Sequence, residues 1–530
     1  SEPEVAAGLT VAALPVHVAK ILAPTLGGVA STIGRARVGT AMAAPLTAPR
    51  TVLIMGYQAL VGPSLGTALA NVVYPIPSVD DAIALFGGGS EIHQGADAAL
   101  DQVLDTTLYG VAFAEVANPT MASASSFSQW VLTPTGASVI GGIIYIIVDG
   151  VEFPVSILDT MSVADQLTAI YTEIGKFKNL PVWMPAAPSS TTLGFRTKHT
   201  GLRSNQHVIR FRVEGITGTS YAIVQTATAV NDGNPQTCFD AINQQDFDYI
   251  VCGATEPAPG ASANPGITRF INNVNNRAQP LVGLRGVLVC AMKDSYANVV
   301  TNSLGVNAHR GWLPWCRDAE DFSIRIAARF AAAIALGTSS DPTANLCNTA
   351  LVNLVGPQLK SSWISEQEAT QALNNGITPL RFNRQGSCYI TRPITTRFQD
   401  LNGNPDYRTL DIGKVLEPDY IADYLASDIP VTWGGYKLRD DDPNDLGQPL
   451  DKVCTPKLFK SYLAGILRTE YSLNRLKNPE PYINGDGSGS IQGVLRCYIH
   501  PVVGWRIVAD MPADVIDIFA QQEITVRQVG

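Results

Sequence analysis

A candidate nucleophile is the first chemical feature of this sequence. The segment TVLIMGYQALVGPSLG (51–66) is an apolar run followed by Gly62-Pro63-Ser64-Leu65-Gly66, which matches the G-x-S-x-G pattern of the nucleophile elbow in α/β hydrolases. In that fold the serine is followed along the chain by an acid and then by a histidine. The sequence therefore raises the hypothesis of a serine hydrolase of α/β type that uses Ser64.

The rest of the chain gives Ser64 little support. Of the six histidines, only His309 and His500 lie late enough in the chain and outside a predicted β-rich insertion, and neither sits in a recognisable loop motif. No HGGG-type oxyanion string precedes the serine, and Pro63 is unfavourable in a tight, strained elbow. We interpret Ser64 as a loop serine and keep the hydrolase as the alternative hypothesis.

Metal and phosphate motifs are incomplete. An aspartate-rich run resembles a calcium loop through Asp440, Asp442 and Asn444, but Asp445 stands where the loop needs glycine and Asp451 where it needs glutamate. A second partial match starts at 484 and has leucine at its glutamate position, 495. The string FGGGS at 86–90 has no following lysine, which predicts a turn or hinge. We expect no catalytic residue, no cofactor and no metal.

Composition and charge exclude several classes of protein. Among the 530 residues, 46% are apolar and 16% charged, and the formal net charge is −9. Nucleic-acid binding needs clustered Lys and Arg, so this balance argues against it. No apolar run reaches the roughly 18 residues of a membrane span, and the first residues, SEPEVAAG, do not resemble a secretory signal. We expect a soluble protein that starts in the cytoplasm.

The spacing of the cysteines matches no zinc-binding or disulfide pattern. No C-x-x-C pair occurs, and several cysteines lie in apolar, strand-like runs, so we expect buried structural thiols in a reducing compartment. They are Cys238, Cys252, Cys290, Cys316, Cys347, Cys388, Cys454 and Cys497.

Alternating strands and helices predict an α/β core. The helix expected at 78–86 has Ser78 as its N-cap and two aspartates in its first turn, which suits the helix dipole. The runs FDYIVCG (247–253) and RGVLVCAM (285–292) are almost continuously apolar, which is typical of strands in a sheet covered on both faces. Further strands are expected at 51–57 and 109–116, and further helices at 91–104 and 318–336.

Residues 121–228 interrupt this alternation with a β-rich insertion. Strands are expected at 143–148 and 151–157, joined by Asp149-Gly150, because this dipeptide supplies the positive φ angles of a two-residue hairpin. A capped helix at 162–175 and strands at 193–200 and 207–215 follow.

These elements predict an α/β fold of the α+β multidomain kind, in five parts. The predicted parts are an extended arm (1–45), a core made of 46–120 and 229–400, the inserted domain (121–228), and a C-terminal domain with a terminal strand (401–530).

Several strings resemble the tail sheath protein of contractile bacteriophages of the Mu-like type. The strings span most of 50–425 and are TVLIMGY, IPSVDDAIALFGGGSE, AALDQVL, DFDYIVCG, AEDFSIRIAARFAAAI, the run from Asn375 to Leu380, YITRPITT and DYRTLDIGKVLEPDYIADYL. The arm at 1–45 matches no string of the family.

The resemblance implies a structural, non-enzymatic subunit, whose core would be the subtilisin-like sheath domain. Such a protein polymerises with itself as a helical homo-oligomer of stacked hexameric rings around an inner tail tube protein. It also meets baseplate and tail terminator proteins, and its contraction drives the tube through the host envelope for genome delivery. The implied location is the virion tail, after assembly in the host cytoplasm, without a nucleic-acid or membrane partner. The sheath of a phage-like bacteriocin or secretion device is a further alternative.

The end of the chain is a candidate contact between subunits. Glu523, Ile524, Thr525, Val526 and Arg527 alternate polar and apolar types as a strand does. The resemblance implies that this strand, like the N-terminal arm, adds to a sheet of an adjacent subunit. An internal edge strand is the alternative.

A predicted helix at 455–477 is the second candidate contact. It carries an apolar face at helical spacing and a set of basic residues, and the resemblance implies that the basic face meets the inner tube. Exposed ion pairs are individually weak and screened by salt, which suits a contact that must be released; a solvated helix face is the alternative. The basic residues are Lys457, Lys460, Arg468, Arg475 and Lys477.

Overall fold

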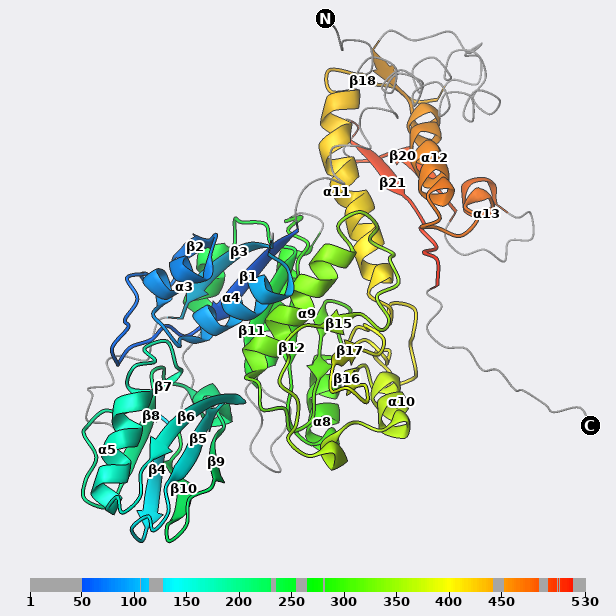
Figure 1. Cartoon of the computed structure of the whole chain (residues 1–530). Helices are drawn as coiled ribbons and strands as arrows, with labels where there is room; N and C mark the ends of the chain where they lie inside the picture. Colours follow the sequence, from blue (N-terminus) through cyan, green and yellow to red (C-terminus); the bar gives the residue numbers. More distant parts are fainter. Residues whose placement is uncertain are drawn as a thin grey trace, which may run out of the picture. The chain divides into compact units, whose positions relative to one another are not determined.

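The computed structural model shows a mixed α and β chain of two compact units (Figure 1). The larger unit holds Pro49–Gly337 and Leu346–Asp411, and the smaller unit includes Thr338–Asn345 and Ile412–Gly530. The predicted arm at 1–45 and strand at 523–527 lie outside the described residues, and the five-part division of the chain stays a prediction. The structure describes residues 50–104, 106–113, 127–229, 235–253, 265–279, 282–441, 452–485, 494–502, 504 and 506–517.

A six-stranded sheet organises the larger unit. Its order is β13-β12-β11-β1-β3-β2, and all neighbours run parallel except β2, which is antiparallel to β3. The strands are β1 (Thr51–Gly56), β2 (Val73–Ile76), β3 (Thr107–Ala112), β11 (Tyr249–Gly253), β12 (Val287–Ala291) and β13 (Gly311–Trp312).

Helices cover both faces of this sheet. On one face, Leu53, Ile250 and Leu288 share an apolar core with α6 (Gln236–Ile242), α7 (Pro265–Arg277) and α8 (Tyr296–Val306). The other face packs on α4 (Glu91–Gln102) and α9 (Ser323–Gly337), where Gly95 brings α4 close to Ile54. All residues of β11 and β12 are buried, which confirms the expectation drawn from their continuous apolar runs.

The first residue of α3 agrees with the prediction from the sequence, whereas the first residue of α9 differs from it. In α3 (Val79–Phe86) the side chain of Ser78 accepts the N–H of Asp81 at 3.2 Å, so the predicted cap is confirmed. The helix expected from 318 begins only at Ser323, because Asp318 has φ 51° and cannot belong to a right-handed helix.

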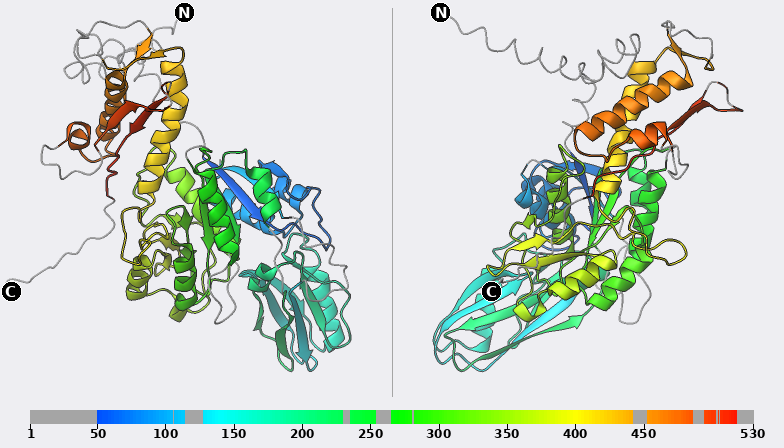
Figure 2. Two further views of the ribbon diagram at one scale, coloured as in Figure 1. Left: turned by 180° about the vertical axis from the view of Figure 1, so that it is seen from behind. Right: turned by 90° about the vertical axis from the view of Figure 1, so that its right-hand side faces the viewer.

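The inserted region (127–229) is β-rich, as predicted, and appears in cyan to green in Figure 2. Two antiparallel sheets, β10-β4-β8-β7 and β6-β5-β9, share a core with one helix. The hairpin turn has φ 48° at Asp149 and φ 82° at Gly150, which confirms the predicted two-residue turn. The elements are β4 (Gln129–Thr135), β5 (Gly142–Val148), β6 (Val151–Ile157), α5 (Val163–Ile174), β7 (Val182–Trp183), β8 (Leu193–Thr197), η3 (Leu202–Gln206), β9 (Ile209–Glu214) and β10 (Ser220–Ala227).

A small sheet completes the larger unit. Its order is β14-β16-β17-β15, and α10 packs against β16. The elements are β14 (Pro314–Trp315), β15 (Ala350–Leu351), η4 (Lys360–Ser362), α10 (Glu366–Asn374), β16 (Thr378–Phe382) and β17 (Cys388–Ile390).

The smaller unit holds two long helices, whereas the sequence predicts one. The helix α11 (Gly413–Trp433) continues through Pro418 and Pro430, residues that argue against a helix when sequence alone is read. The expected helix at 455–477 is α12 (Pro456–Ser472), which is shorter because Asn474 has φ 60°. The short elements are β18 (Lys437–Leu438), β19 (Val453–Cys454), α13 (Glu480–Asn484), β20 (Arg496–Ile499) and β21 (Ile507–Asp510).

Burial of most cysteines agrees with the expectation of buried thiols. The structure describes all eight cysteines, none of them in a disulfide, and six are buried. Within the described ranges, no helix combines the length and the hydropathy that crossing a bilayer requires.

The glycine string at 87–89 is a turn pressed against the inserted region. Gly87 has φ 85° and Gly89 has φ 83°. A Cβ atom on Gly89 would lie 2.0 Å from the carbonyl oxygen of Leu180, a distance that no side chain can occupy. Both the backbone angle and the close approach therefore require glycine at this position.

Gly89→Ala is expected to destabilise the protein more than Gly386→Ala. Gly386 has a similar φ of 89°, but no atom lies within 4 Å of the position that a Cβ would take there. Gly386→Ala is therefore destabilised only by backbone strain, which costs about 1–2 kcal/mol. Gly89→Ala adds a clash with backbone atoms. Urea unfolding of both variants measures the difference, and equal losses would contradict the close approach.

Candidate functional site

Ser64 does not form a nucleophile elbow. It lies in the connection between β1 and β2, and no helix starts directly after it, although an elbow joins a strand to a helix. Its hydroxyl oxygen accepts the N–H of Gly88 at 3.2 Å. Ser64 therefore supports the glycine turn, and its surroundings argue against the hydrolase hypothesis.

The described part of the aspartate-rich run contacts the first residues of a helix. Asp441 accepts the N–H of Lys457, at the start of α12, with a distance of 3.0 Å. The candidate positions Asp442, Asn444, Asp445 and Asp451 lie outside the described residues. Among the residues that the structure describes, no group of three or more His, Cys, Asp and Glu side chains could hold a metal ion.

The five basic residues predicted to face a tube do not form one surface. The Arg468 guanidinium donates to both carboxylate oxygens of Glu480 at 2.5 and 2.9 Å. Lys477 lies after the helix and pairs with Asp517 at 2.9 Å. Both cations are therefore neutralised within their own unit.

The prediction that Arg475 belongs to an exposed basic face is wrong. Its guanidinium pairs with Glu470 at 2.9 Å, donates to the carbonyl oxygen of Ser340 at 2.8 Å, and lies over the ring of Tyr420. Arg475 is buried because the helix has already ended and the chain turns back toward the core. Of the five candidates, Lys457 and Lys460 have no ion-pair partner within the described ranges.

A buried carboxyl group lies beside this arginine. Glu417 of α11 is fully buried beside the carboxyl group of Glu470. Burial, and next the negative charge of Glu470, raise the pKa of Glu417 to about 8. Arg475 and Asp341 are the other charged groups that act on it, and the arginine only partly offsets the effect. Its surroundings therefore favour the protonated form of Glu417.

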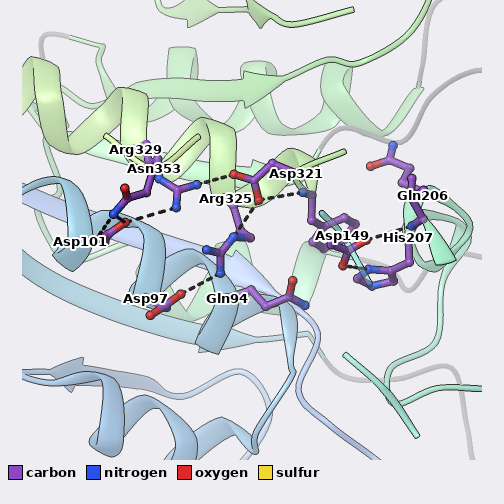
Figure 3. A network of polar contacts seen from close by, with 12 residues as sticks. Gln94, Asp97, Asp101, Asp149, Gln206, His207, Asp321, Arg325, Arg329 and Asn353 are labelled. Atoms are coloured by element: carbon purple, nitrogen blue, oxygen red, sulfur yellow. Dashed lines mark hydrogen bonds and ion pairs between the residues drawn. The ribbon is translucent and has the colours of Figure 1, made fainter. Parts of the chain in front are cut away.

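A second network of charged side chains, buried only at its centre, joins α4 to α9 in the larger unit (Figure 3). Asp321 accepts from Arg325 at 2.7 Å and also pairs with Arg329. Arg325 reaches Asp97 at 2.7 Å, and Arg329 reaches Asp101 at 3.4 Å. The pair of Asp321 and Arg329 is fully buried, and losing one partner of such a pair costs about 3–5 kcal/mol, whereas Asp97 and Asp101 are partly exposed and contribute less.

Sequence reasoning missed this network, although its signal is visible. Asp321, Arg325 and Arg329 recur at intervals of four residues, and so do Asp97 and Asp101. Charges at this spacing lie on one face of a helix. Because such a face is usually solvated, the pattern alone does not indicate burial.

Charged side chains also join the inserted region to the core. Arg203 pairs with the fully buried Glu91 at 3.2 Å, and Arg210 binds Glu320 through two hydrogen bonds of 2.7 and 2.8 Å. The Lys198 ammonium donates to the carbonyl oxygen of Gly88 at 2.8 Å, and burial lowers the pKa of Lys198 to about 8. This junction is polar, buried and specific in its pairing.

Glu417→Gln is expected to make the smaller unit more stable at alkaline pH. The folded-state pKa of Glu417 is raised, so its favourable contribution is complete below the ordinary value of 4.5 and is lost as the pH rises toward 8. Glutamine stays neutral throughout. The variant should match the wild type near pH 5 and exceed it by about 1–3 kcal/mol near pH 8 in thermal unfolding.

Glu480→Gln is the matched control, with the opposite sign. The hydrogen bond from Arg468 lowers the pKa of Glu480, so this carboxylate stabilises the fold at neutral pH and loses that contribution as the pH falls. Parallel pH profiles of the two variants would contradict a protonated Glu417.

Two sheath tail proteins are among the solved structures that are similar to this chain. No family model and no curated protein matches the chain. A sheath tail protein from Desulfitobacterium hafniense has 11% identity and a TM-score of 0.42, with 89% of this chain and 97% of that chain covered. A sheath tail protein from Listeria innocua has 12% identity and a TM-score of 0.44, with 90% of this chain and 95% of that chain covered. At this level of similarity no residue's role is transferred to the present chain.

Proposed function

We propose that this chain is a structural, non-enzymatic subunit of a contractile tail sheath. The strings of 50–425 that resemble the Mu-like sheath family support the proposal. The observation that carries it is an open two-stranded ribbon, β20–β21, in the smaller unit. In the part of the chain that the structure describes, neither strand pairs with a further strand.

The ribbon is incomplete as a sheet. Its strands have four residues each and pair from Arg496 with Asp510 to Ile499 with Ile507. A two-stranded ribbon is marginal in water, and its open edges are templates for an added strand. Most of its residues are half-buried or exposed, so an incoming strand can reach them.

The chain itself offers a suitable strand. Residues 523–527 alternate polar and apolar types, and in the proposed assembly they add to the ribbon of a neighbouring copy. About five main-chain hydrogen bonds, each contributing about 0.5–1.5 kcal/mol net, make one joint weak. Repetition over a lattice makes many such joints strong through effective concentration.

The inner tube is the second proposed partner. Lys457 and Lys460 remain as the basic residues of α12 that can meet an acidic tube surface, because the other three candidates are bound within the unit. Exposed charge contacts are weak and depend on salt, so the tube can be held and then released.

The remaining parts of the proposal follow the resemblance. Copies assemble in the host cytoplasm into stacked hexameric rings of the virion tail, between baseplate and tail terminator proteins. Contraction of a metastable extended array then drives the tube through the host envelope for genome delivery, without a cofactor on this chain.

Deleting 522–530 tests the strand joint. The purified full chain at high concentration should form long hollow tubes in negative-stain electron microscopy, and the truncated chain should not, because the added strand is missing. Small particles from both proteins would contradict the sheath proposal. Tubes from both would contradict the joint alone.

Substitutions within the strand provide the matched control. Ile524→Asp with Val526→Asp changes one face of the predicted strand, and Thr525→Asp changes the other. Tubes should be lost with the double variant and kept with Thr525→Asp.

Reversing Lys457 and Lys460 to glutamate tests the tube contact. The double variant should fold normally, because both side chains lie outside the core, and should cover fewer inner tubes in electron micrographs at low and moderate salt. The double reversal of Lys176 and Lys178, two exposed lysines of the inserted region, makes the same change in charge and is the control. Equal coverage by both variants would contradict the contact.

A further inference from the structure

Two cysteines face each other across neighbouring strands of the central sheet (Figure 1). Cys252 of β11 and Cys290 of β12 are directly paired in the parallel register of these strands. Their sulfur atoms lie 2.8 Å apart. Both side chains are buried in the apolar core that the sheet shares with α6, α7 and α8. The pair is therefore held in place by the hydrogen-bonded backbone of two strands.

The contact between sulfur atoms distinguishes this pair from other cysteines of the chain. Cys238 directs its thiol at the carbonyl oxygen of Ala112, at 3.3 Å, and the sulfur of Cys454 lies 3.9 Å from the carbonyl oxygen of Thr455. Carbon atoms in ordinary contact are about 3.5–4.0 Å apart, and sulfur is a larger atom than carbon. At 2.8 Å, the two paired sulfur atoms are therefore nearer than van der Waals contact.

The backbone of the two strands satisfies the requirements of a disulfide. Such a bond needs Cα atoms about 4.4–6.8 Å apart and a sulfur–sulfur bond of about 2.0 Å. Neighbouring strands lie about 4.7–4.9 Å apart, and Cys252 and Cys290 are paired directly, Cα to Cα. Bond formation therefore needs a rotation of the two side chains and no change of strand register.

The surroundings of the pair preserve the thiol form. Both residues are free cysteines in the structure. Burial, and next the hydrogen bond with Cys252, raise the pKa of the Cys290 thiol well above its ordinary value. A protonated, buried thiol reacts slowly with bulky reagents. An oxidant as small as a peroxide, by contrast, meets both sulfur atoms together once it enters the core.

We propose that Cys252 and Cys290 are a site of oxidative modification, where hydrogen peroxide converts two thiols into a disulfide between β11 and β12. One sulfur attacks the peroxide, its S–H bond and the O–O bond break, and a sulfenic acid and one water are formed. The other sulfur then displaces the sulfenic oxygen, which leaves with the second thiol proton as another water. Two thiols are oxidised, and one peroxide is reduced to two water molecules.

The disulfide joins two strands whose cysteines are 38 positions apart in the sequence. A cross-link of this span stabilises a fold mainly by restricting the unfolded chain. The oxidised protein therefore resists unfolding better than the reduced protein. The inference concerns the core of the larger unit and does not rest on the sheath proposal.

Mass spectrometry of the peroxide-treated full chain tests the modification. The reduced protein is treated while folded, its remaining thiols are alkylated under denaturing conditions, and it is digested with a protease. The peptides of Cys252 and Cys290 should be recovered cross-linked, with the loss of two hydrogen atoms, and both thiols should disappear in equal amounts. Both residues remaining as thiols, or oxidised without a cross-link, while the half-buried Cys347 and Cys497 are oxidised, would overturn the proposal.

Cys252→Ser and Cys238→Ser are matched variants for the stability of the cross-linked protein. Both replace a buried cysteine of the same core by serine, but only the first removes a member of the pair. Peroxide should raise the midpoint of thermal unfolding of the wild type and of Cys238→Ser, and a thiol reductant should reverse the rise. The midpoint of Cys252→Ser should not rise. The same response in all three proteins would contradict a stabilising bond between β11 and β12.

Discussion

Charges removed from water must find partners, and the larger unit depends on this constraint. Asp321 lies between Arg325 and Arg329, and the same two cations reach the aspartates of α4. Because α4 and α9 together cover one face of the central sheet, these pairs fix that layer. The opposite face packs on α6, α7 and α8 mainly through an apolar core.

The inserted region follows the same rule. Arg203, Lys198 and Arg210 each meet a specific partner on the core, and His207 is held between Asp149 and a second histidine. A shift of one residue would leave several of these charges buried and unmatched. Pairing therefore selects one arrangement of the insertion, whereas an apolar contact would tolerate several.

The smaller unit combines a buried polar cluster with open edges. Glu417, Glu470 and Arg475 lie close together at the two long helices, and the pKa of Glu417 is raised first by burial and next by the charge of Glu470, which Arg475 offsets only in part. Its ribbon of β20 and β21 is left with unfilled edges in the described part of the chain. Such open edges are the feature that the proposed addition of a strand from another copy would use.

The sequence by itself determined the local elements: the Ser78 cap, the Asp149-Gly150 turn and the continuously apolar strands β11 and β12 all follow from short-range chemistry. It also predicted the covered α/β core, because hydrophobic pattern sets which faces are buried. Only the tertiary structure decided which charges lie inside. From sequence alone, Arg475 is predicted to be a surface residue of a basic helix. The spacing of Asp321, Arg325 and Arg329 likewise predicts a helix face exposed to solvent. Burial of a charge depends on partners that lie far away in the chain, and no local pattern records them.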